Sequence, residues 1–324
     1  MKTMPETAPT GGGKTDWGLI GAFVALVLGA AAMGASPIFV RYASSDVGPF
    51  ASAFFRVFLA LPVLYVWMRI ENAKKPDIAA KSRPFSLFPI LAGLAFAGDL
   101  FFWHLSIMGT SIANATFFAT LAPVWVIGIT WLVLKQHVAR SALVGIALCL
   151  CGGAILVGKT MSISPENLVG DCFGVITSFF FGLYFLAASR ARRDGGLSAG
   201  ITFVQSAVTA AVLLVCALIH TAVGGVGFLP DSARGLLALV GLALVSQVGG
   251  QGLLVVSMGR LPAVFSSLVI FLEAVVAAFL GWLLMDEAIT GSQFLGGLLI
   301  LVGIWVARPR SQANPPPTAS GATE

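Results

Sequence analysis

Two carboxylic acids and one arginine fall well inside long apolar stretches of the sequence, away from their ends, where charged side chains are rare. Asp99 follows Phe85 by 14 residues and Glu273 follows Leu261 by 12 residues, which places each acid near the middle of its stretch. Arg56 is the only basic residue inside such a stretch. A charge in an apolar medium is costly unless it is paired or neutralised. The acids could therefore exchange protons or receive a cationic group, and the arginine could receive a carboxylate.

Polar and aromatic residues accompany these charges at helical spacing. Trp103 lies one helical turn after Asp99 on the same face and could stack on an apolar ligand. The adjacent His104 titrates near neutral pH and could pass a proton. Gln247 and Gln251 stand at i and i+4 among glycines, which suits recognition of a zwitterion. The full set of candidate pathway residues is Arg56, Asp99, Trp103, His104, Asn114, Gln247, Gln251, Ser266 and Glu273.

Each candidate also has a structural interpretation, which the sequence leaves open. A buried carboxyl or a glutamine can join two helices by hydrogen bonding. Trp103 could be a packing residue, and His104 could be a histidine that is satisfied near a helix end. Arg56 could extend toward water or pair with Asp46.

The overall composition defines the medium around these residues. Charged residues make up only 10% of the 324 residues and hydrophobic residues 57%, whereas a soluble domain has about 25% charged residues. Apolar runs of 17 to 25 residues recur between Trp17 and Ala307, and each can cross a hydrocarbon core of roughly 30 Å as a helix. A transmembrane barrel would instead show alternating segments of about ten residues. We therefore expect an all-α polytopic membrane protein, with the lipid bilayer as a partner.

Polar, glycine and proline breaks divide the apolar sequence into ten expected transmembrane helices. Their ranges are 17–40, 50–68, 85–108, 111–134, 141–158, 168–188, 200–222, 234–258, 261–285 and 291–307. The first run is too long for a signal-peptide core, so we expect it to be retained. Residues 1–16 and 308–324 are expected to be disordered cytoplasmic tails. Pro37, Pro62 and Pro123 are candidate hinges.

The distribution of basic residues predicts the orientation. Ten helices place both termini on one side, and that side receives 15 of the 19 Lys and Arg residues. Only Arg41, Lys159 and Arg234 fall on the opposite side. The positive-inside rule then places both termini in the cytoplasm and the chain in the cell (inner) membrane. Because the charges lie at helix ends, topology accounts for them and we expect no nucleic-acid partner.

The sequence repeats itself with a shift of about 150 residues. With a shift of 151, Leu121, Val124, Trp131, Gly145 and Gly152 fall on Leu272, Val275, Trp282, Gly296 and Gly303. Chance matching between Leu-, Val- and Gly-rich helices is the alternative, but the near-constant shift favours a duplication. Each half, 17–158 and 168–307, holds five helices, an odd number, so the second half must enter the membrane from the opposite side. Inverted repeats of this kind are typical of secondary transporters, whose midplane site faces the two sides alternately.

Several of the repeated stretches carry a family resemblance. They are Leu121-Ala122-Pro123-Val124 and Leu272-Glu273-Ala274-Val275, each followed by a Trp-containing helix end, with Asp286-Glu287 and a glycine-rich last helix. They resemble the EamA repeats of the drug/metabolite transporter superfamily, and the chain is similar to its YddG-like amino-acid exporters. The resemblance implies two inverted five-helix repeats and export of amino acids or other small metabolites. The sequence departs from the pattern at Ala274, where proline is more common, and at Lys135-Gln136, where an acidic residue is usual.

The motifs that are absent narrow the function further. Without a GxxxxGK[ST] loop the chain has no ATP site, so we expect a gradient of substrate or protons to drive transport. The chain has no HExxH motif and no Cys/His pair that would indicate an enzyme. The four cysteines lack CxxC spacing, so we expect no cofactor and no metal. We therefore expect a carrier that exports small molecules, in particular aromatic or other apolar amino acids. A channel-like facilitator and an exporter of another drug or metabolite class remain the alternatives.

Overall fold

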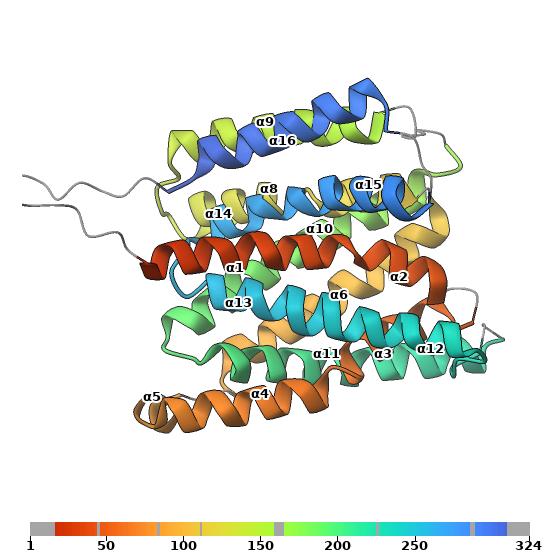
Figure 1. The fold of residues 1–324 in the computed structure, drawn as a ribbon, viewed down its shortest axis with the longest axis horizontal. Coiled ribbons are helices and arrows are strands. Elements are labelled where there is room, and N and C mark those ends of the chain that lie inside the picture. Colours follow the sequence, from red (N-terminus) through yellow and green to blue (C-terminus); the bar gives the residue numbers. More distant parts are fainter. Residues whose placement is uncertain are drawn as a thin grey trace, which may run out of the picture.

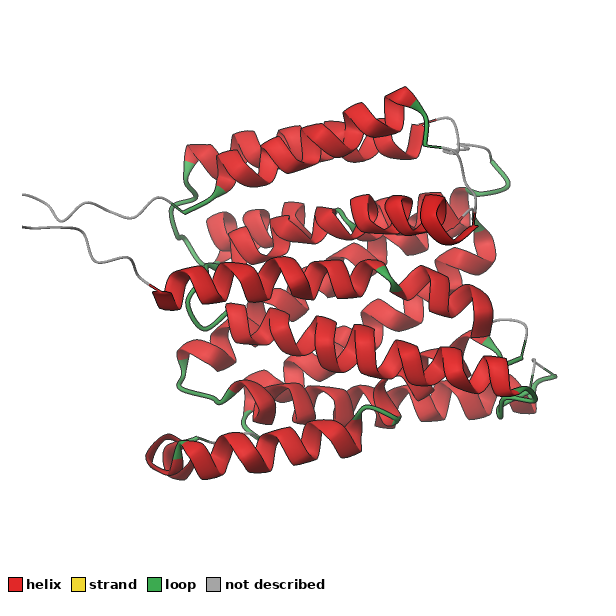
Figure 2. Cartoon of the chain, in the orientation of Figure 1, coloured by secondary structure: helices red, strands yellow, loops and turns green. Residues whose placement is uncertain are grey.

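The structure, a computed structural model, describes residues 17–43, 46–82, 85–110, 112–158, 165–224, 227–285 and 289–309. These ranges form a bundle of helices that run roughly along one direction (Figure 1), and they contain no strand (Figure 2). The expected disordered tails lie outside the described residues, apart from Arg308 and Pro309, and so does Asp286-Glu287.

Ten apolar segments cross the bundle, as the sequence predicts. In the described ranges nine have 18 to 26 residues and the last has 17. The first half contains α1 (Trp17–Gly34), α2 (Ser36–Ala43), α3 (Pro49–Phe58), α4 (Leu61–Lys74), α5 (Pro76–Lys81), α6 (Leu87–Gly109), α7 (Ile112–Ala119), α8 (Ala122–Gly128), the π-helix η1 (Ile129–Val133) and α9 (Arg140–Val157). The second half contains α10 (Leu168–Arg193), α11 (Ser198–Ala222), α12 (Ala233–Gly241), the π-helix η3 (Leu242–Gln251), α13 (Gly252–Ser257), α14 (Ala263–Leu268), the 3-10 helix η4 (Val269–Phe271), α15 (Leu272–Met285) and α16 (Gly291–Ala307).

The helix boundaries differ most from expectation where basic residues end a helix. The helix α4 continues to Lys74 and not only to residue 68, and α10 continues to Arg193 and not only to residue 188. Cations are favourable in the last turn of a helix because they face its unpaired carbonyl groups. The basic turns therefore continue helices whose apolar part has already ended.

Each of the three candidate hinge prolines follows a break in its transmembrane segment. The first segment breaks at Ala35, the second at residues 59–60 and the fourth at residues 120–121. Pro37, Pro62 and Pro123 then lie in the first turn of the next helix. Proline removes a backbone donor and clashes with the preceding turn, so a helix ends before it.

The close packing of α9 against α16 reflects the two inverted repeats. A Cβ atom on Gly145 would lie 2.7 Å from the carbonyl oxygen of Gly303, and one on Gly152 would lie 2.6 Å from that of Gly296. In the repeat, Gly145 corresponds to Gly296 and Gly152 to Gly303. Exchanging the two halves therefore converts the contact between Gly145 and Gly303 into the contact between Gly296 and Gly152. A pseudo-twofold axis between antiparallel helices requires this relation. Glycine is needed here because it lets the backbones touch.

Both ends of the described chain lie at the same end of the bundle, where α1 begins and α16 ends (Figure 1). We call this the terminal end, and the opposite end, where α2 ends and α12 begins, the distal end. The guanidinium of Arg260 packs against Gly18 at the start of α1, and that of Arg192 packs against Gly259. Basic residues that lie far apart in the sequence therefore gather at the terminal end.

Candidate functional site

A cavity lies inside the bundle and leaves about 60 Å³ for the centres of water-sized molecules. Its lining residues are Met33, Gly34, Ser36, Pro37, Arg56, Phe96, Asp99, Leu100, Trp103, Thr116, Ala119, Phe181, Glu273 and Ala277. Along α6 the lining runs from Phe96 to Trp103, and along α15 from Glu273 to Ala277. Both helices run from the terminal to the distal end (Figure 1), so the cavity extends from mid-bundle toward the distal end.

Arg56 reaches the cavity from α3 and is only 3% exposed. Its Nε donates a hydrogen bond to Gln247 Oε1 at 3.3 Å, and its Nη2 lies 3.2 Å from Met33 Sδ. The guanidinium also lies over the ring of Phe96, 5.6 Å from the centroid. Gln247 is itself held, because its Nε2 donates to Ser206 Oγ at 3.0 Å. Neutral partners therefore fix the guanidinium at the cavity wall.

The two alternatives for Arg56 that the sequence left open are not what the structure contains. The side chain does not extend to water, and Asp46 accepts a hydrogen bond from the backbone N–H of Ser232 at 3.0 Å. Asp46 follows α2 at the distal end, so it lies outside the cavity that Arg56 faces.

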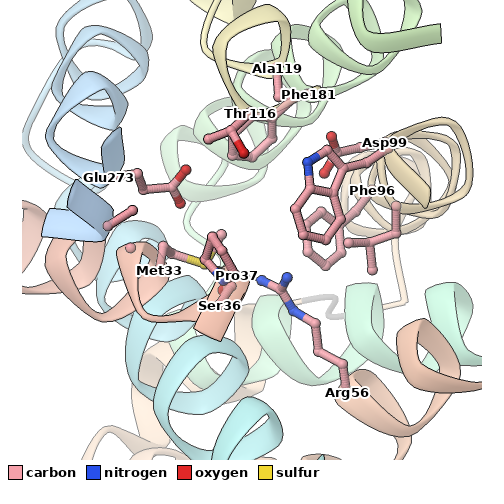
Figure 3. A pocket seen from close by; sticks show the side chains of 14 residues that line it. Met33, Ser36, Pro37, Arg56, Phe96, Asp99, Thr116, Ala119, Phe181 and Glu273 are labelled. Carbon is pink, nitrogen blue, oxygen red and sulfur yellow. Dashed lines mark hydrogen bonds between the residues drawn. The ribbon is translucent and has the colours of Figure 1, made fainter. Parts of the chain in front are cut away.

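Asp99 and Glu273 face the cavity from different walls (Figure 3). Asp99 lies on α6 and is 7% exposed, while Glu273 lies in the first turn of α15 and is partly buried. Neither carboxylate approaches the Arg56 guanidinium within 4.0 Å. Glu273 Oε1 is shielded from solvent and has no hydrogen-bond partner in the described structure. The acidic and basic groups thus stand apart, with space between them.

A close helix contact sets the position of Glu273. A Cβ atom on Gly34, at the end of α1, would lie 2.9 Å from the carbonyl oxygen of Glu273 and 2.8 Å from Cβ of Val276. Glycine permits this approach because it has no side chain. The break at Ala35 then turns Ser36 and Pro37 into the cavity wall.

Aromatic rings make up much of the remaining wall. Trp103 is 9% exposed and packs edge-on against His104, with 5.1 Å between the ring centroids. Phe96 and Phe181 both contact Tyr184, with centroid distances of 5.4 and 5.8 Å. Trp103 is therefore part of the cavity wall.

His104 and Asn114 lie outside the cavity lining. His104 is 2% exposed, its Nδ1 is 2.6 Å from the Leu100 carbonyl oxygen, and its ring packs on Phe50. Asn114 donates from Nδ2 to Asp171 Oδ1 at 3.0 Å and so joins α7 to α10. A backbone acceptor and a cross-helix carboxylate hold these side chains away from the cavity.

The helix that carries the glutamines also differs from expectation. The segments α12, η3 and α13, which carry the candidates Gln247 and Gln251, contribute no residue to the described lining. Gln247 accepts the hydrogen bond from Arg56 and does not itself line the cavity, whereas Gln251 and Ser266 are fully buried toward the terminal end. Neither side chain of these two has a hydrogen-bond partner among the described residues. The lining comes instead from α1, α2, α3, α6, α7, α10 and α15.

Sequence reasoning missed Met33, Ser36, Thr116 and Phe181 as lining residues. Pro37 was the available signal for the first two, because a proline break inside a long apolar run turns neighbouring side chains inward. Thr116 and Phe181 carry no local signal, since their rotation about the helix axis depends on how α7 and α10 pack.

Residues 196–200, Gly-Leu-Ser-Ala-Gly, match the spacing of a hydrolase nucleophile motif. That motif requires a strand, a sharp turn and a helix, whereas Ser198 begins α11 shortly after α10 ends. Ser198 is 3% exposed, and its carbonyl oxygen accepts a hydrogen bond from Thr202 Oγ1 at 2.9 Å. The match is an ordinary helix start.

Comparisons with known proteins agree with the two-repeat architecture. The model of the EamA-like transporter family matches residues 19–158 and again residues 168–308. Two proteins of Archaeoglobus fulgidus, both described as uncharacterized transporters, are 25% and 22% identical over 87% and 83% of this chain, and the matches cover 94% and 91% of their own lengths. A protein of known crystal structure superposes with a TM-score of 0.70 at 17% identity, covering 90% of this chain and 96% of its own. That structural likeness concerns the fold alone.

Proposed function

Since the chain belongs to the EamA-like transporter family, we propose that it exports amino acids with aromatic or other apolar side chains by alternating access. The separated charges of the cavity carry this proposal. An α-amino acid presents a carboxylate and an ammonium group, and Arg56 and the two acids offer a partner for each. The aromatic wall of Trp103 and Phe96 would receive the apolar side chain.

The number of charges also suggests a role for the additional acid. The cavity holds one guanidinium and two carboxylates, whereas a zwitterion needs only one of each. Asp99 lies near the aromatic wall on α6 and is assigned to the substrate ammonium. Glu273, with one oxygen unpartnered, is assigned to proton exchange. Proton movement against substrate movement would then drive export.

Alternating access is supported by polar groups that are buried without partners. A buried, unsatisfied polar group costs about 1–3 kcal/mol, so Gln251 and Ser266 destabilise the described conformation. Ser266 lies seven residues before Glu273, roughly 10 Å nearer the terminal end. Tyr184, which packs against the lining residues Phe96 and Phe181, is fully buried on this side. In the opposite state water would reach Gln251 and Ser266.

Cysteine accessibility tests this alternation. In a background with the four native cysteines replaced by alanine, Ala277→Cys should react with a water-soluble thiol reagent applied from the distal side and be protected by substrate. Ser266→Cys should react only from the terminal side, and more slowly when substrate holds the distal-facing state. Equal reaction of both positions from both sides would indicate a continuous pore, as in a channel.

The proposed orientation places both termini in the cytoplasm and the distal end outside the inner membrane. It follows from the basic residues at the terminal end, because positive residues remain on the cytoplasmic side. A reporter fused after Glu324 and a cysteine at Asp77 in α5 should both be inaccessible to an impermeant reagent outside intact cells. Modification of both would reverse the orientation.

A competition assay tests the substrate class. Proteoliposomes that exchange labelled phenylalanine would receive unlabelled phenylalanine, its methyl ester or its N-acetyl derivative. A hydrogen bond to a charged group contributes about 1.5–3 kcal/mol, so the zwitterion should compete at least about tenfold better than either derivative. If the ester or the N-acetyl compound competes equally well, the zwitterion assignment fails and another metabolite class is indicated.

A further inference from the structure

A second and much larger cavity lies in the terminal half of the bundle. It has a volume of about 1040 Å³ and shares no lining residue with the central cavity. Its walls come from α6 and α10 on one side and from η1, α9, α14 and the end of α16 on the other. This volume stands at the top of the roughly 300–1,000 Å³ range of small-molecule pockets. It is large enough for a molecule much larger than an amino acid.

We call this second cavity the groove, and its side walls are mainly apolar. Leu91 and Leu94 on α6 line one wall and are 40% and 46% exposed. Leu183 and Leu186 on α10 continue the same wall. Because these side chains stay exposed, protein atoms do not fill the groove. In a bilayer, these exposed apolar side chains favour contact with hydrocarbon over contact with water.

The rim of the groove at the terminal end is basic. Arg190, Arg193 and Arg308 line it, and no Asp or Glu belongs to the described lining. Arg190 forms an ion pair with Asp194 at 3.1 Å and lies over the ring of Phe88. Arg193 is exposed and has no ion-pair partner among the described residues. Arg308 is also exposed, and it lies over the ring of Trp305, a neutral partner, 4.5 Å from the centroid. Neither Arg193 nor Arg308 pairs with a carboxylate of the described residues, so both are available to an anion.

The length of α10 places these arginines at the depth of lipid headgroups. Its 26 residues extend about 39 Å at a rise of 1.5 Å per residue, which exceeds a hydrocarbon core of roughly 30 Å. The last turn, with Arg190 and Arg193, therefore projects into the headgroup region. An apolar groove below a basic rim matches a lipid that has acyl chains and an anionic head.

We propose that this groove binds an anionic phospholipid of the leaflet at the terminal end. Its phosphate receives charge-assisted hydrogen bonds from Arg193 and Arg308, whose planar guanidinium groups suit phosphate geometry. Its acyl chains occupy the space beside Leu94 and Leu183. Basic pockets between transmembrane helices bind anionic headgroups in this way. A zwitterionic substrate fits poorly, because no residue of the described lining offers a carboxylate for its ammonium group.

Native mass spectrometry of the full-length protein in detergent tests the proposal. Equal amounts of phosphatidylglycerol and phosphatidylcholine with identical acyl chains would be added. The unaltered protein should retain phosphatidylglycerol several-fold more than phosphatidylcholine. The double variant Arg193→Gln/Arg308→Gln should lose that preference, while Arg69→Gln, an exposed arginine of α4 away from the groove, should keep it. Equal retention of both lipids by the unaltered protein would overturn the proposal.

A second variant separates this groove from non-specific surface charge. Ala187→Trp would fill the groove without changing its rim, and it should lower retention of phosphatidylglycerol by at least about the same factor as the double variant. Glycerol 3-phosphate, which has the anionic group but no acyl chains, should not displace the lipid. Undiminished lipid retention by Ala187→Trp, or displacement by glycerol 3-phosphate, would mean that the rim binds free anions and that the groove holds no specific lipid.

Discussion

Replacement of Arg56 by glutamine is the sharpest perturbation of the central cavity. The guanidinium is held by Gln247, Met33 and the ring of Phe96, all of them neutral. Its charge is therefore not paired with a carboxylate among the described residues. A substrate carboxylate would provide that counter-charge. Arg56→Gln removes the charge, keeps a polar amide at the wall and leaves the two acids in place.

The expected magnitude follows from one hydrogen-bonded charge. Such a bond contributes about 1.5–3 kcal/mol, which corresponds to a rise of roughly 10- to 150-fold in the KM for a zwitterionic amino acid. The KM for the amino-acid methyl ester, which lacks the carboxylate, should change by less than about threefold. Arg56→Lys should lie between, because it keeps a positive charge but loses the planar donor pair.

Exchange kinetics in proteoliposomes would measure both KM values for each variant. Arg234→Gln is the matched control, since this exposed residue of α12 lies over the ring of Tyr42, 4.5 Å from the centroid, outside the cavity. Its KM values should equal those of the unaltered protein. The reasoning is refuted if Arg56→Gln changes the KM values of amino acid and ester by the same factor, because the residue then acts on the scaffold alone.

Three further substitutions test separate parts of the account. Asp99→Asn should raise the KM for the zwitterion by about tenfold or more in exchange, because it removes the partner of the substrate ammonium; an unchanged KM would remove Asp99 from the binding site. Glu273→Gln should abolish proton-driven accumulation and its dependence on pH while exchange continues, and an unchanged pH profile would make Glu273 structural. Gly152→Val should destabilise the fold by about 1–3 kcal/mol through overpacking, because a Cβ atom there already meets a carbonyl oxygen at 2.6 Å. Gly21→Val, where nothing lies within 4 Å of the added atom, should leave the melting temperature nearly unchanged.

The ten helices could be predicted from the lengths of the apolar runs, and the two repeats from the residues that match at a shift of about 150, because both features are visible in the sequence itself. The faces that line the cavity were harder to predict. Gln247 and Gln251 stand at i and i+4, which would share one face in an α-helix. They lie in the π-helix η3, whose wider turn follows i to i+5 hydrogen bonding. Gln247 therefore meets Arg56, while Gln251 turns to a different environment.

The contribution of α1 and α3 to the cavity could not be read from residue types. Met33 and Ser36 become lining residues because the chain breaks at Ala35 and because Gly34 packs on the backbone of Glu273. Arg56 was recognised as an intramembrane charge, but its partners came from α1 and η3, which are distant in the sequence. Such partnerships depend on helix packing, and no local pattern encodes it.

Counterflow in proteoliposomes tests the central claim most directly. Vesicles with the purified protein and a high internal concentration of unlabelled phenylalanine would be diluted into a trace of labelled phenylalanine. A carrier with one cavity that faces the two sides alternately should accumulate the label transiently above its external concentration, and vesicles without internal substrate should not. Equilibration of the label without any transient accumulation would contradict the account, because it would mean that the cavity is open to both sides at once.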